Sequence, residues 1–523
     1  MNAVIPHADA RPSSPAGALP AAGPWRVRAD DPALEEVAAT VRALLAPHLP
    51  DETAGEAPRE LVLGLHELAS APPLGIAPDG GADPVDEGYR LRADADGITC
   101  HGRTPAGVFR GATTALQLIA TARVTGELPY QELADAPRYA WRGLMVDPAR
   151  SFLTPDEVRR IIDLAALYKL NVLHLHLTDN EGWRIELPGT PALTAPGAEF
   201  YTAADYRALQ EYAARRFVTV VPEIDLPGHC ATLRAAVPGL PPAPAPAGLA
   251  DRFPFVPPLD LTDEATRTAV ARVLREVCAL TAGPFVHIGA DEAFGATPES
   301  FDASVRELRT LVRDLGKRPV AWQESSRAGA GPEDIAQYWV DVPMMDLPDT
   351  AEELAARPEL VAAGRTMEII SALKKFFAPT DDDLRRTVEG GGRVLLSPQS
   401  HLYLDRPYAA EFAPPEQAAE AARLGFDGYR PLGVRHTAAW DPAAYAVPDA
   451  NVAGVEATVF AERFKGFEDV SVLLLPRLPS VAEAAWCGRA PGWAEYRARL
   501  AHHGRMWTDR GLAYFASTEV DWR

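Results

Sequence analysis

Apolar runs alternate with amphipathic stretches along the chain from Trp141 onward. Short apolar runs separated by segments with helical periodicity are typical of parallel sheets covered by helices. We take eight runs as strands: Gly143–Val146, Asn171–Leu177, Val218–Pro222, Phe285–Ile288, Pro319–Trp322, Ala336–Val340, Arg393–Leu396 and Val455–Phe460. The first helix has a start signal, since Thr154-Pro155-Asp156-Glu157 forms a capping box with proline at the first helical position. This pattern predicts an α/β fold, a closed (β/α)8 TIM barrel over residues 139–523.

The chain before residue 139 follows a different pattern. Residues 1–23 are rich in alanine, proline and polar residues, and we expect a flexible N-terminal tail there. Residues 24–138 predict a small α+β domain. Its expected elements are a helix over Pro32–Leu45, strands over Glu60–Leu65 and Tyr89–Arg92, and a helix over Thr104–Ala122. A doubly wound open sheet is the alternative to the barrel, but it would need a glycine-rich nucleotide loop after an early strand, which the sequence lacks.

Two long insertions interrupt the predicted barrel. Residues 236–258 are rich in proline, and residues 341–392 contain two expected helices between the sixth and seventh strands. Both follow the carboxyl end of a predicted strand. In a barrel of this kind those loops rise over the catalytic face, so we expect both insertions beside the site.

Composition limits the partners of the chain. The 51 Lys and Arg residues against 72 Asp and Glu residues give a net charge of −21 without a basic block, which argues against a nucleic-acid surface. The four cysteines form no CxxC pair, so we expect neither a disulfide framework nor a zinc cluster. The sequence shows no signal peptide and no apolar stretch of the ~18 residues that a membrane span needs. We therefore expect no membrane partner and a cytoplasmic location.

Polar and aromatic side chains gather at the carboxyl ends of the predicted strands. They are Asp147, Arg150, Asp179, Glu223, Asp225, His229, Asp291, Glu292, Trp322, Glu324, Trp339, Tyr403, Asp405 and Glu462. A single carboxylate at a strand end is most often solvated or caps a helix, but in a barrel all eight ends converge on one pocket. Carboxylates and an arginine can bind sugar hydroxyls, and tryptophan faces cover the C–H side of a pyranose. The pocket therefore predicts a sugar ligand.

Five segments resemble the motifs of glycoside hydrolase family 20, the β-N-acetylhexosaminidases. They are RGLMVDPARSF (142–152), NVLHLHLTDNEGWRIE (171–186), VTVVPEIDLPGH (218–229), HIGADE (287–292) and YLD (403–405). Upstream, EGYRL (87–91) and TPAGVFRGATTALQL (104–118) resemble the small domain that precedes the barrel in that family. The order of the motifs is that of the family. The resemblance implies a TIM barrel that removes terminal N-acetylhexosamine residues.

The resemblance also implies a role for each site residue. Glu292 would be the general acid/base, Asp291 would orient the 2-acetamido group, and Tyr403 would donate a hydrogen bond to its carbonyl oxygen. The substrate-binding residues would be Arg150 and Glu462 at the outer hydroxyls, Asp405 at the far end of the ring, Trp322 and Trp339 around the acetamide, and Phe460 as a platform on the last strand. Asp179 and His229 would support Glu292.

The adjacency of Asp291 and Glu292 fits the mechanism that the resemblance implies. An ordinary retaining glycosidase places two carboxyl groups ~5 Å apart on either side of the sugar, and neighbouring residues at one strand end are poorly placed for that. If the acetamido oxygen of the substrate attacks the anomeric carbon, the protein needs no nucleophile of its own. The resemblance therefore implies retaining exo-hydrolysis of β-linked N-acetylglucosamine or N-acetylgalactosamine from a glycan or glycoconjugate, without cofactor or metal.

Two other functions remain open at this point. His174 and His176 point to the same face of a strand and, with His287 and Asp291, could bind the metal of a metal-dependent amidohydrolase. A non-catalytic sugar-binding protein could use the same scaffold. The joint presence of Asp291, Glu292 and Tyr403 argues against the second.

The sequence departs from the family pattern at several positions. Ser151 stands where the family usually has histidine, Ala290 replaces the second glycine of the signature, and Phe460 replaces a typical tryptophan. The sequence also does not reveal the family's extra pocket tryptophan between Tyr403 and Trp440. Specificity between gluco and galacto sugars is not determined by these motifs.

Overall fold

The N-terminal part of the chain folds as a mixed sheet covered by two helices. In the computed structural model, which describes residues 3–13, 16–21, 23–48, 58–68, 71–194, 197–241, 256–341, 347–362 and 364–523, the sheet order is β1-β8-β5-β6-β4-β3. The strands are β1 (Ala10–Pro12), β3 (Trp25–Ala29), β4 (Arg59–Leu65), β5 (Tyr89–Asp94), β6 (Gly97–Gly102) and β8 (Gln131–Asp135). Helices α1 (Glu35–Leu45) and α2 (Pro105–Thr125) pack on it, and β2 (Ala18–Pro20) pairs with β7 (Glu127–Pro129).

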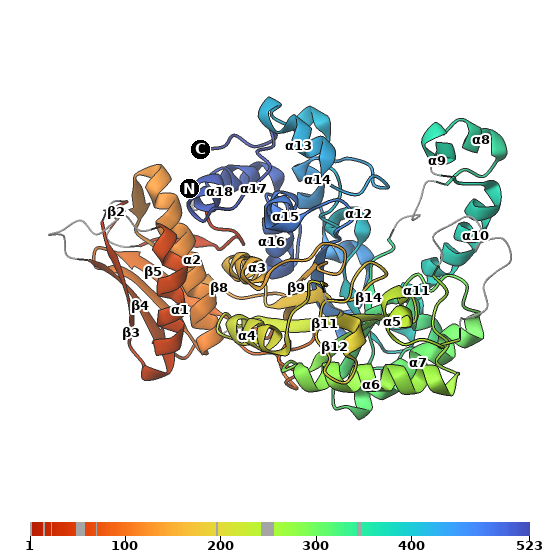
Figure 1. Cartoon of the computed structure of the whole chain (residues 1–523). Helices are drawn as coiled ribbons and strands as arrows, with labels where there is room; N and C mark the ends of the chain where they lie inside the picture. The colour runs from red at the N-terminus through yellow and green to blue at the C-terminus, as the bar shows by residue number, and fades with distance from the viewer. Residues whose placement is uncertain are drawn as a thin grey trace.

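Helix α2 joins this small domain to the rest of the molecule (Figure 1). Thr104 caps its first turn, Pro105 occupies the first helical position, and Gly126 ends it in the left-handed conformation. From this helix, Arg110 reaches the buried Glu87 at 2.7 Å and the carbonyl of Phe217 at 2.7 Å. Glu87 also accepts a hydrogen bond from Arg142 of the first barrel strand at 2.5 Å. The two domains are therefore joined by paired buried charges, which need this close geometry to offset their desolvation.

The first residues of the chain differ from the flexible tail that the sequence predicts. Val4 and Ile5 are fully buried, and Gln117 of α2 accepts a hydrogen bond from the Ile5 amide at 2.8 Å and donates one to its carbonyl at 2.7 Å. Strand β1 then pairs with β8. The prediction of a tail over residues 1–23 is therefore wrong for these residues, because their partners lie far away in sequence and leave no local periodicity.

The second domain is a closed barrel of eight parallel strands, as predicted. Its order is β10-β11-β12-β13-β14-β15-β16-β9. The strands are β9 (Trp141–Val146), β10 (Val172–His176), β11 (Thr219–Leu226), β12 (Phe285–Gly289), β13 (Arg318–Trp322), β14 (Ile335–Tyr338), β15 (Arg393–Leu396) and β16 (Val452–Val459). Each overlaps one of the eight predicted runs.

Helices surround the barrel and extend beyond it. They are α3 (Pro155–Leu167), α4 (Ala203–Ala214), α5 (Ala231–Ala236), α6 (Glu264–Leu280), α7 (Pro298–Asp314), α11 (Asp383–Glu389), α12 (Gln399–Leu402), α13 (Ala418–Arg423), α14 (Val434–Ala438), α15 (Gly466–Leu474), α16 (Leu478–Cys487), α17 (Trp493–Leu500) and α18 (His503–Asp509). The predicted capping box of α3 is present, with Thr154 and Glu157 exchanging side-chain and backbone hydrogen bonds. Both chain ends lie beside each other near α18 (Figure 1).

The barrel interior is layered because side chains alternate along each strand. Along β10, Val172, His174 and His176 face inward in turn. Val172 belongs to an apolar cluster that fills the amino-terminal end of the barrel, with Trp141, Val221, Phe285, Val320, Ile335, Leu395, Ala453 and Ile76. His174 lies in a buried charged layer with Glu223 and Glu456. The candidate site lies above this layer, at the carboxyl ends of the strands.

The two predicted insertions differ in what the structure describes. Residues 242–255 of the proline-rich insertion lie outside the described residues. The 341–392 insertion forms α8 (Ala351–Ala355), α9 (Pro358–Ala362) and α10 (Met367–Phe377) before α11, so it holds more helices than expected. In Figure 1, α8 and α9 protrude from the body of the molecule at the far end of α10.

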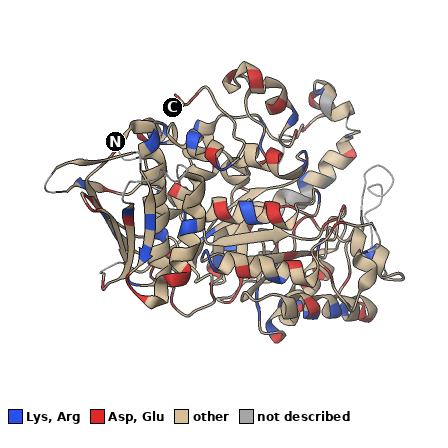
Figure 2. Cartoon of the chain, turned by 60° about the vertical axis from the view of Figure 1, so that its left-hand side comes forward, with Lys and Arg blue, Asp and Glu red and all other residues tan. Residues whose placement is uncertain are grey.

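Acidic and basic residues are interspersed over the part of the molecule seen in Figure 2. Among the described residues, no single helix combines the length and apolar composition of a membrane span, although α15 and α16 meet those limits as a pair bent by 51°.

Candidate active site

Every predicted site residue except Tyr403 and Asp405 ends a barrel strand or lies within four residues of its end, and the closed barrel brings these strand ends together. Arg150 follows β9, Asp179 follows β10, and Asp291 and Glu292 follow β12. Trp322 ends β13, Trp339 follows β14, and Phe460 follows β16. Tyr403 lies after α12 but forms a bridge with Thr458 of β16, which returns it to the same face.

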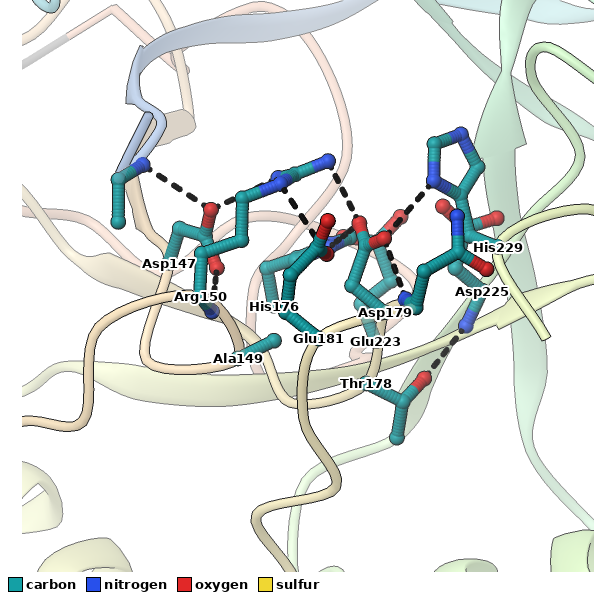
Figure 3. Close-up of polar contacts among 12 residues, drawn as sticks. Asp147, Ala149, Arg150, His176, Thr178, Asp179, Glu181, Glu223, Asp225 and His229 are labelled. Atoms are coloured by element: carbon teal, nitrogen blue, oxygen red, sulfur yellow. Dashed lines mark hydrogen bonds and ion pairs between the residues drawn. The ribbon is translucent and has the colours of Figure 1, made fainter. Parts of the chain in front are cut away.

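Arg150 lies among carboxylates at one side of this face (Figure 3). Its guanidinium is 2.8 Å from Asp147, 2.7 Å from Asp179 and 3.7 Å from both Glu181 and Glu462. Burial alone would lower the pKa of Arg150, but Asp147 and Asp179 outweigh it and raise this pKa. Asp147 also accepts the Ala461 amide at 3.0 Å, which ties the end of β9 to the end of β16. Arg150 is therefore a fixed cation with donors left for a ligand.

Asp179, His229 and Glu292 form a line toward the pocket. His229 Nδ1 is 3.0 Å from Asp179 Oδ1, while His229 Nε2 is 3.6 Å from Glu292 Oε2 and 3.9 Å from Asp291 Oδ2. Burial would lower the pKa of His229, but the Asp179 carboxylate and further acids raise it well above its usual value. The structure therefore brings Glu292 together with Asp179 and His229, the two residues to which the resemblance gives a supporting role.

The loop carrying Asp291 and Glu292 has an unusual backbone. Gly289, Ala290 and Glu292 have φ values of 70°, 75° and 42°, in the left-handed region that favours glycine. A Cβ on Gly289 would lie 1.7 Å from Asp225 Oδ1, so only glycine fits there. At Ala290 the cost is of a different kind, because the left-handed backbone conformation costs a non-glycine residue ~1–2 kcal/mol. The departure from the family pattern at Ala290 therefore introduces backbone strain.

Asp291 is deeply placed, with a side chain 13% exposed against 28% for Glu292. Its Oδ1 has no hydrogen-bond partner among the described residues, and the same holds for Asp225 Oδ1. Burial and the Asp225 carboxylate raise the pKa of Asp291 well above its usual range, while burial raises the pKa of Asp225 to about 7. A cationic or N–H group placed against Asp291 would therefore find an acceptor with a free oxygen.

Aromatic rings form a wall beside these acids. Trp339 stacks on Tyr403 with centroids 6.0 Å apart and planes at 7°, and Trp322 meets Trp339 edge-on at 6.3 Å. Glu223 accepts the Trp322 indole N–H at 2.8 Å, and Glu324 accepts that of Trp339 at 3.0 Å. Because both buried N–H groups are bonded, the indoles are held in fixed orientations.

Phe460 belongs to the same wall. Its ring centroid is 5.4 Å from Tyr403 and 6.2 Å from Trp322, and the Arg150 guanidinium lies 5.5 Å from it. Asp405 is buried nearby, and burial raises its pKa to about 7. Glu462, with a side chain 39% exposed, lies at the rim on the Arg150 side.

Two features of the site were missed from sequence. Tyr429 lies edge-on to Tyr403 at 6.2 Å, in the stretch between Tyr403 and Trp440 where the sequence does not reveal the family's extra tryptophan. Ile369 and Leu373 of α10 join Trp322, Trp339 and Tyr403 in one apolar cluster. The apolar face of α10 predicts that this helix packs against something, but the residues that it contacts lie far away in the sequence.

The H-x-H pair is bound to carboxylates. His176 Nδ1 is 2.5 Å from Glu223 and its Nε2 is 2.9 Å from Asp179, while His174 Nδ1 is 2.8 Å from Glu456. The donor atoms of His174, Glu223 and His287 lie within 4.8 Å of one another, a spacing also compatible with a metal. In the structure these groups form a buried charged layer, in which three imidazoles and one indole surround the Glu223 carboxylate.

Comparisons with known proteins identify the family. The model described as "Glycosyl hydrolase family 20, catalytic domain" matches residues 139–489, and "Glycosyl hydrolase family 20, domain 2" matches residues 4–136. A β-N-acetylhexosaminidase of Cellulomonas fimi is 33% identical over 84% of this chain and 82% of that protein.

Solved structures agree with this assignment over the whole chain. The GH20 β-N-acetylhexosaminidase from Streptomyces coelicolor A3(2) superposes with a TM-score of 0.74 and 30% identity, over 100% of this chain and 99% of that one. A mutant Streptomyces plicatus β-hexosaminidase in complex with product (GlcNAc) gives 0.73 and 29%, over 100% and 98%. The chain therefore belongs to glycosyl hydrolase family 20, as its motifs predict, and is a glycoside hydrolase.

Proposed function

We propose that this enzyme releases terminal β-linked N-acetylhexosamine with retention, and that the substrate's acetamido oxygen is the nucleophile. One observation carries the proposal: Asp291 and Glu292 both lie within 4 Å of the same nitrogen of His229, at 3.9 and 3.6 Å. Two carboxylates gathered around one imidazole nitrogen lie on one side of the pocket. They cannot flank a sugar ring as the nucleophile and acid of an ordinary retaining glycosidase do.

Each acid then has a separate task. Glu292, the more exposed, protonates the leaving oxygen and afterwards activates water. Asp291 accepts the acetamido N–H and stabilises the positive charge that forms as the acetamido oxygen bonds to the anomeric carbon. That charge favours the ionised form of a carboxyl group whose pKa burial has raised. Tyr403 donates its hydroxyl to the acetamido oxygen, which holds it toward the anomeric carbon.

The remaining residues bind the sugar. Arg150 and Glu462 bind the outer hydroxyls, and Asp405 binds the far end of the ring. Trp322 and Trp339 surround the acetamide, and Phe460 covers an apolar face of the ring. No cofactor or metal is required, because the nucleophile belongs to the substrate and the proton transfers belong to Glu292. The relatives support the substrate class, since their names describe β-N-acetylhexosaminidases and one structure contains GlcNAc.

The test uses Glu292→Gln on aryl β-N-acetylglucosaminides with good and poor leaving groups. General acid catalysis contributes ~10²–10⁴-fold, so turnover of the poor leaving groups should fall by that order, and activated ones should lose much less. The matched control is Glu299→Gln, an exposed glutamate in the first turn of the following helix. Equal losses on both substrate classes would remove Glu292 from the acid role. Comparable rates on a β-glucoside and its 2-acetamido counterpart would overturn the acetamide as nucleophile.

A further inference from the structure

His176 has no role in the reaction described above, yet it contacts the site from below. It lies on β10 with 1% of its surface exposed, and both its nitrogens are bonded. Nδ1 is 2.5 Å from Glu223 Oε2, and Nε2 is 2.9 Å from Asp179 Oδ2 (Figure 3). Burial would lower the pKa of His176, but Glu223 outweighs it and raises this pKa well above its usual value. An imidazolium can donate from both nitrogens, and here both face carboxylates.

Asp179 is the point where the two halves of the site meet. Its Oδ2 lies 2.7 Å from Arg150 Nη2 and is also bonded to His176. Its Oδ1 lies 3.0 Å from His229 Nδ1. The Asn180 amide also donates to Oδ1, at 2.5 Å. A carboxylate has about four lone-pair sites, so Asp179 is filled. Arg150 serves the sugar side and His229 the acid/base side, and each needs Asp179 in one orientation.

Glu223 supplies the fixed end of this arrangement. Its Oε1 accepts the Trp322 indole N–H at 2.8 Å and lies 2.9 Å from His287 Nδ1. Its Oε2 is 3.1 Å from His174 Nε2 as well as bonded to His176. Two imidazoles from β10, one imidazole from β12 and the indole of β13 thus surround one fully buried carboxylate. Movement of Glu223 would disturb the pocket wall through Trp322.

We propose that His176 is a positioning residue for catalysis: it transmits the fixed geometry of Glu223 to Asp179, so that this one carboxylate holds Arg150 and His229 at once. The inference rests on the proposed function, because it assigns Arg150 to the sugar and His229 to Glu292. Loss of the His176–Asp179 bond should therefore impair binding and acid catalysis together.

Two substitutions separate the two bonds of His176. A glutamine amide reaches the place of Nε2 and keeps the donor to Asp179, whereas an asparagine amide takes the place of Nδ1 and keeps the donor to Glu223. His176→Asn should raise KM and lower kcat, with kcat/KM falling ~10–100-fold, the usual effect of removing a supporting bond. The loss of kcat/KM in His176→Asn should be larger on substrates with poor leaving groups. His176→Gln should retain most activity on both classes.

His174 provides the control. It lies on the same strand, is equally buried and also faces Glu223, but its other partner is Glu456 and not Asp179. His174→Asn and His174→Gln should lower Tm as the His176 variants do, without changing the dependence of rate on the leaving group. If His176→Asn and His176→Gln lose activity equally, or if the His174 variants reproduce the leaving-group effect, His176 only stabilises the fold and the proposal is overturned.

A measurement on the unaltered enzyme covers variants that fail to fold. In ¹⁵N spectra of the histidine side chains, His176 should carry protons on both nitrogens at neutral pH, and a neutral ring would overturn the proposal. The outcome is separable from the proposed function. If the wild-type enzyme cleaves no aryl N-acetylhexosaminide, the proposed function fails and the role of His176 with it. If the wild type is active and the two His176 variants are alike, only the role of His176 fails.

Discussion

Neighbouring carboxyl groups in this site have opposite ionisation behaviour, and their partners explain it. Asp179 and Asp225 have oxygens within 4.8 Å of a common histidine, His176, and both are almost fully buried. Burial raises the pKa of both, but His229 and Arg150 outweigh it at Asp179 and lower that pKa well below its usual range. Asp225 lacks the arginine and keeps a pKa of about 7. At the residue scale, then, the number of bonded cations decides which acid stays charged.

Phe460→Trp tests how tightly the pocket wall is packed. Phe460 has Tyr403, Trp322, His176 and Arg150 around it, with ring centroids 5.4, 6.2 and 5.8 Å away for the first three. An added indole ring should clash, because overpacking a filled site costs ~1–3 kcal/mol. We expect a higher KM for an aryl N-acetylglucosaminide and a lower unfolding free energy, measured by steady-state kinetics and urea denaturation.

The control for this substitution is Phe426→Trp, a half-buried ring beside Tyr429. It should leave stability almost unchanged. A lower KM for Phe460→Trp would instead show an open platform that the larger ring fills. No change in kinetics or stability would mean that Phe460 does not face the sugar.

Motif residues could be placed from sequence at this scale, but their surroundings could not. Asp291 and Glu292 directly follow a strand whose apolar run is plain, so their position on the catalytic face follows from the barrel, whereas Tyr403 returns to that face only through its bridge to Thr458. Tyr429 and Ile369 lie in loops and insertions, where no period links them to the strands they contact. Similarly, the strain at Ala290 depends on its φ of 75°, which no sequence pattern reveals.

Elements with a strong local pattern could be predicted, and elements held by distant partners could not. The barrel strands and the capped helix α3 carry their own periodicity and end signals. The first residues of the chain have neither, and their backbone bonds reach distant side chains: Arg499 donates to the Val4 carbonyl at 2.8 Å, and His503 Nε2 is 2.7 Å from the Ala3 carbonyl. The N-terminal segment thus packs between α2 and the C-terminal helices.

Gln117→Leu tests whether this segment stabilises the fold. The buried Gln117 amide bonds the Ile5 amide, the Ile5 carbonyl and the Leu167 carbonyl, the last at 2.9 Å. Leucine leaves these buried groups without a side-chain partner, at ~1–3 kcal/mol for a group left unsatisfied. We expect the unfolding free energy to fall by about 2–4 kcal/mol in urea denaturation, with kcat unchanged.

The comparison for Gln117→Leu is Arg11→Ala on the exposed strand β1, which should alter stability very little. If Gln117→Leu is as stable as the wild type, the first residues contribute nothing to folding.

At the scale of the whole molecule, the site has a cost in stability that depends on pH. Several site acids are buried and favour their neutral form, among them Asp225 and Asp405 with pKa values of about 7. Such groups keep a proton in the folded state that the unfolded chain releases, so stability falls as pH rises between the two pKa values. The raised pKa of His174, about 9, acts in the same direction, since its stabilisation is lost as pH rises from ~6.5 toward that value. The cytoplasmic location predicted from sequence stays a prediction, as no part of this architecture depends on it.

Glu324→Gln isolates one of these contributions. Burial, reinforced by Asp291, raises the pKa of Glu324 to about 8, and its Oε1 has no partner within the described part of the chain. Below pH ~4.3, the pKa of glutamate in the unfolded chain, Glu324 is protonated in both the folded and the unfolded state and does not lower the unfolding free energy. Above it the unfolded chain ionises first, so the wild type should lose up to ~1.4 kcal/mol of stability per pH unit until about pH 8. Glutamine cannot ionise and still accepts the Trp339 N–H, so the variant should become the more stable protein as pH rises.

Unfolding free energies of both proteins between about pH 5 and pH 8 should therefore diverge, whereas Glu352→Gln on the exposed face of α8 should run parallel to the wild type. Parallel curves for Glu324→Gln would mean that Glu324 ionises as readily in the folded enzyme as in the unfolded chain.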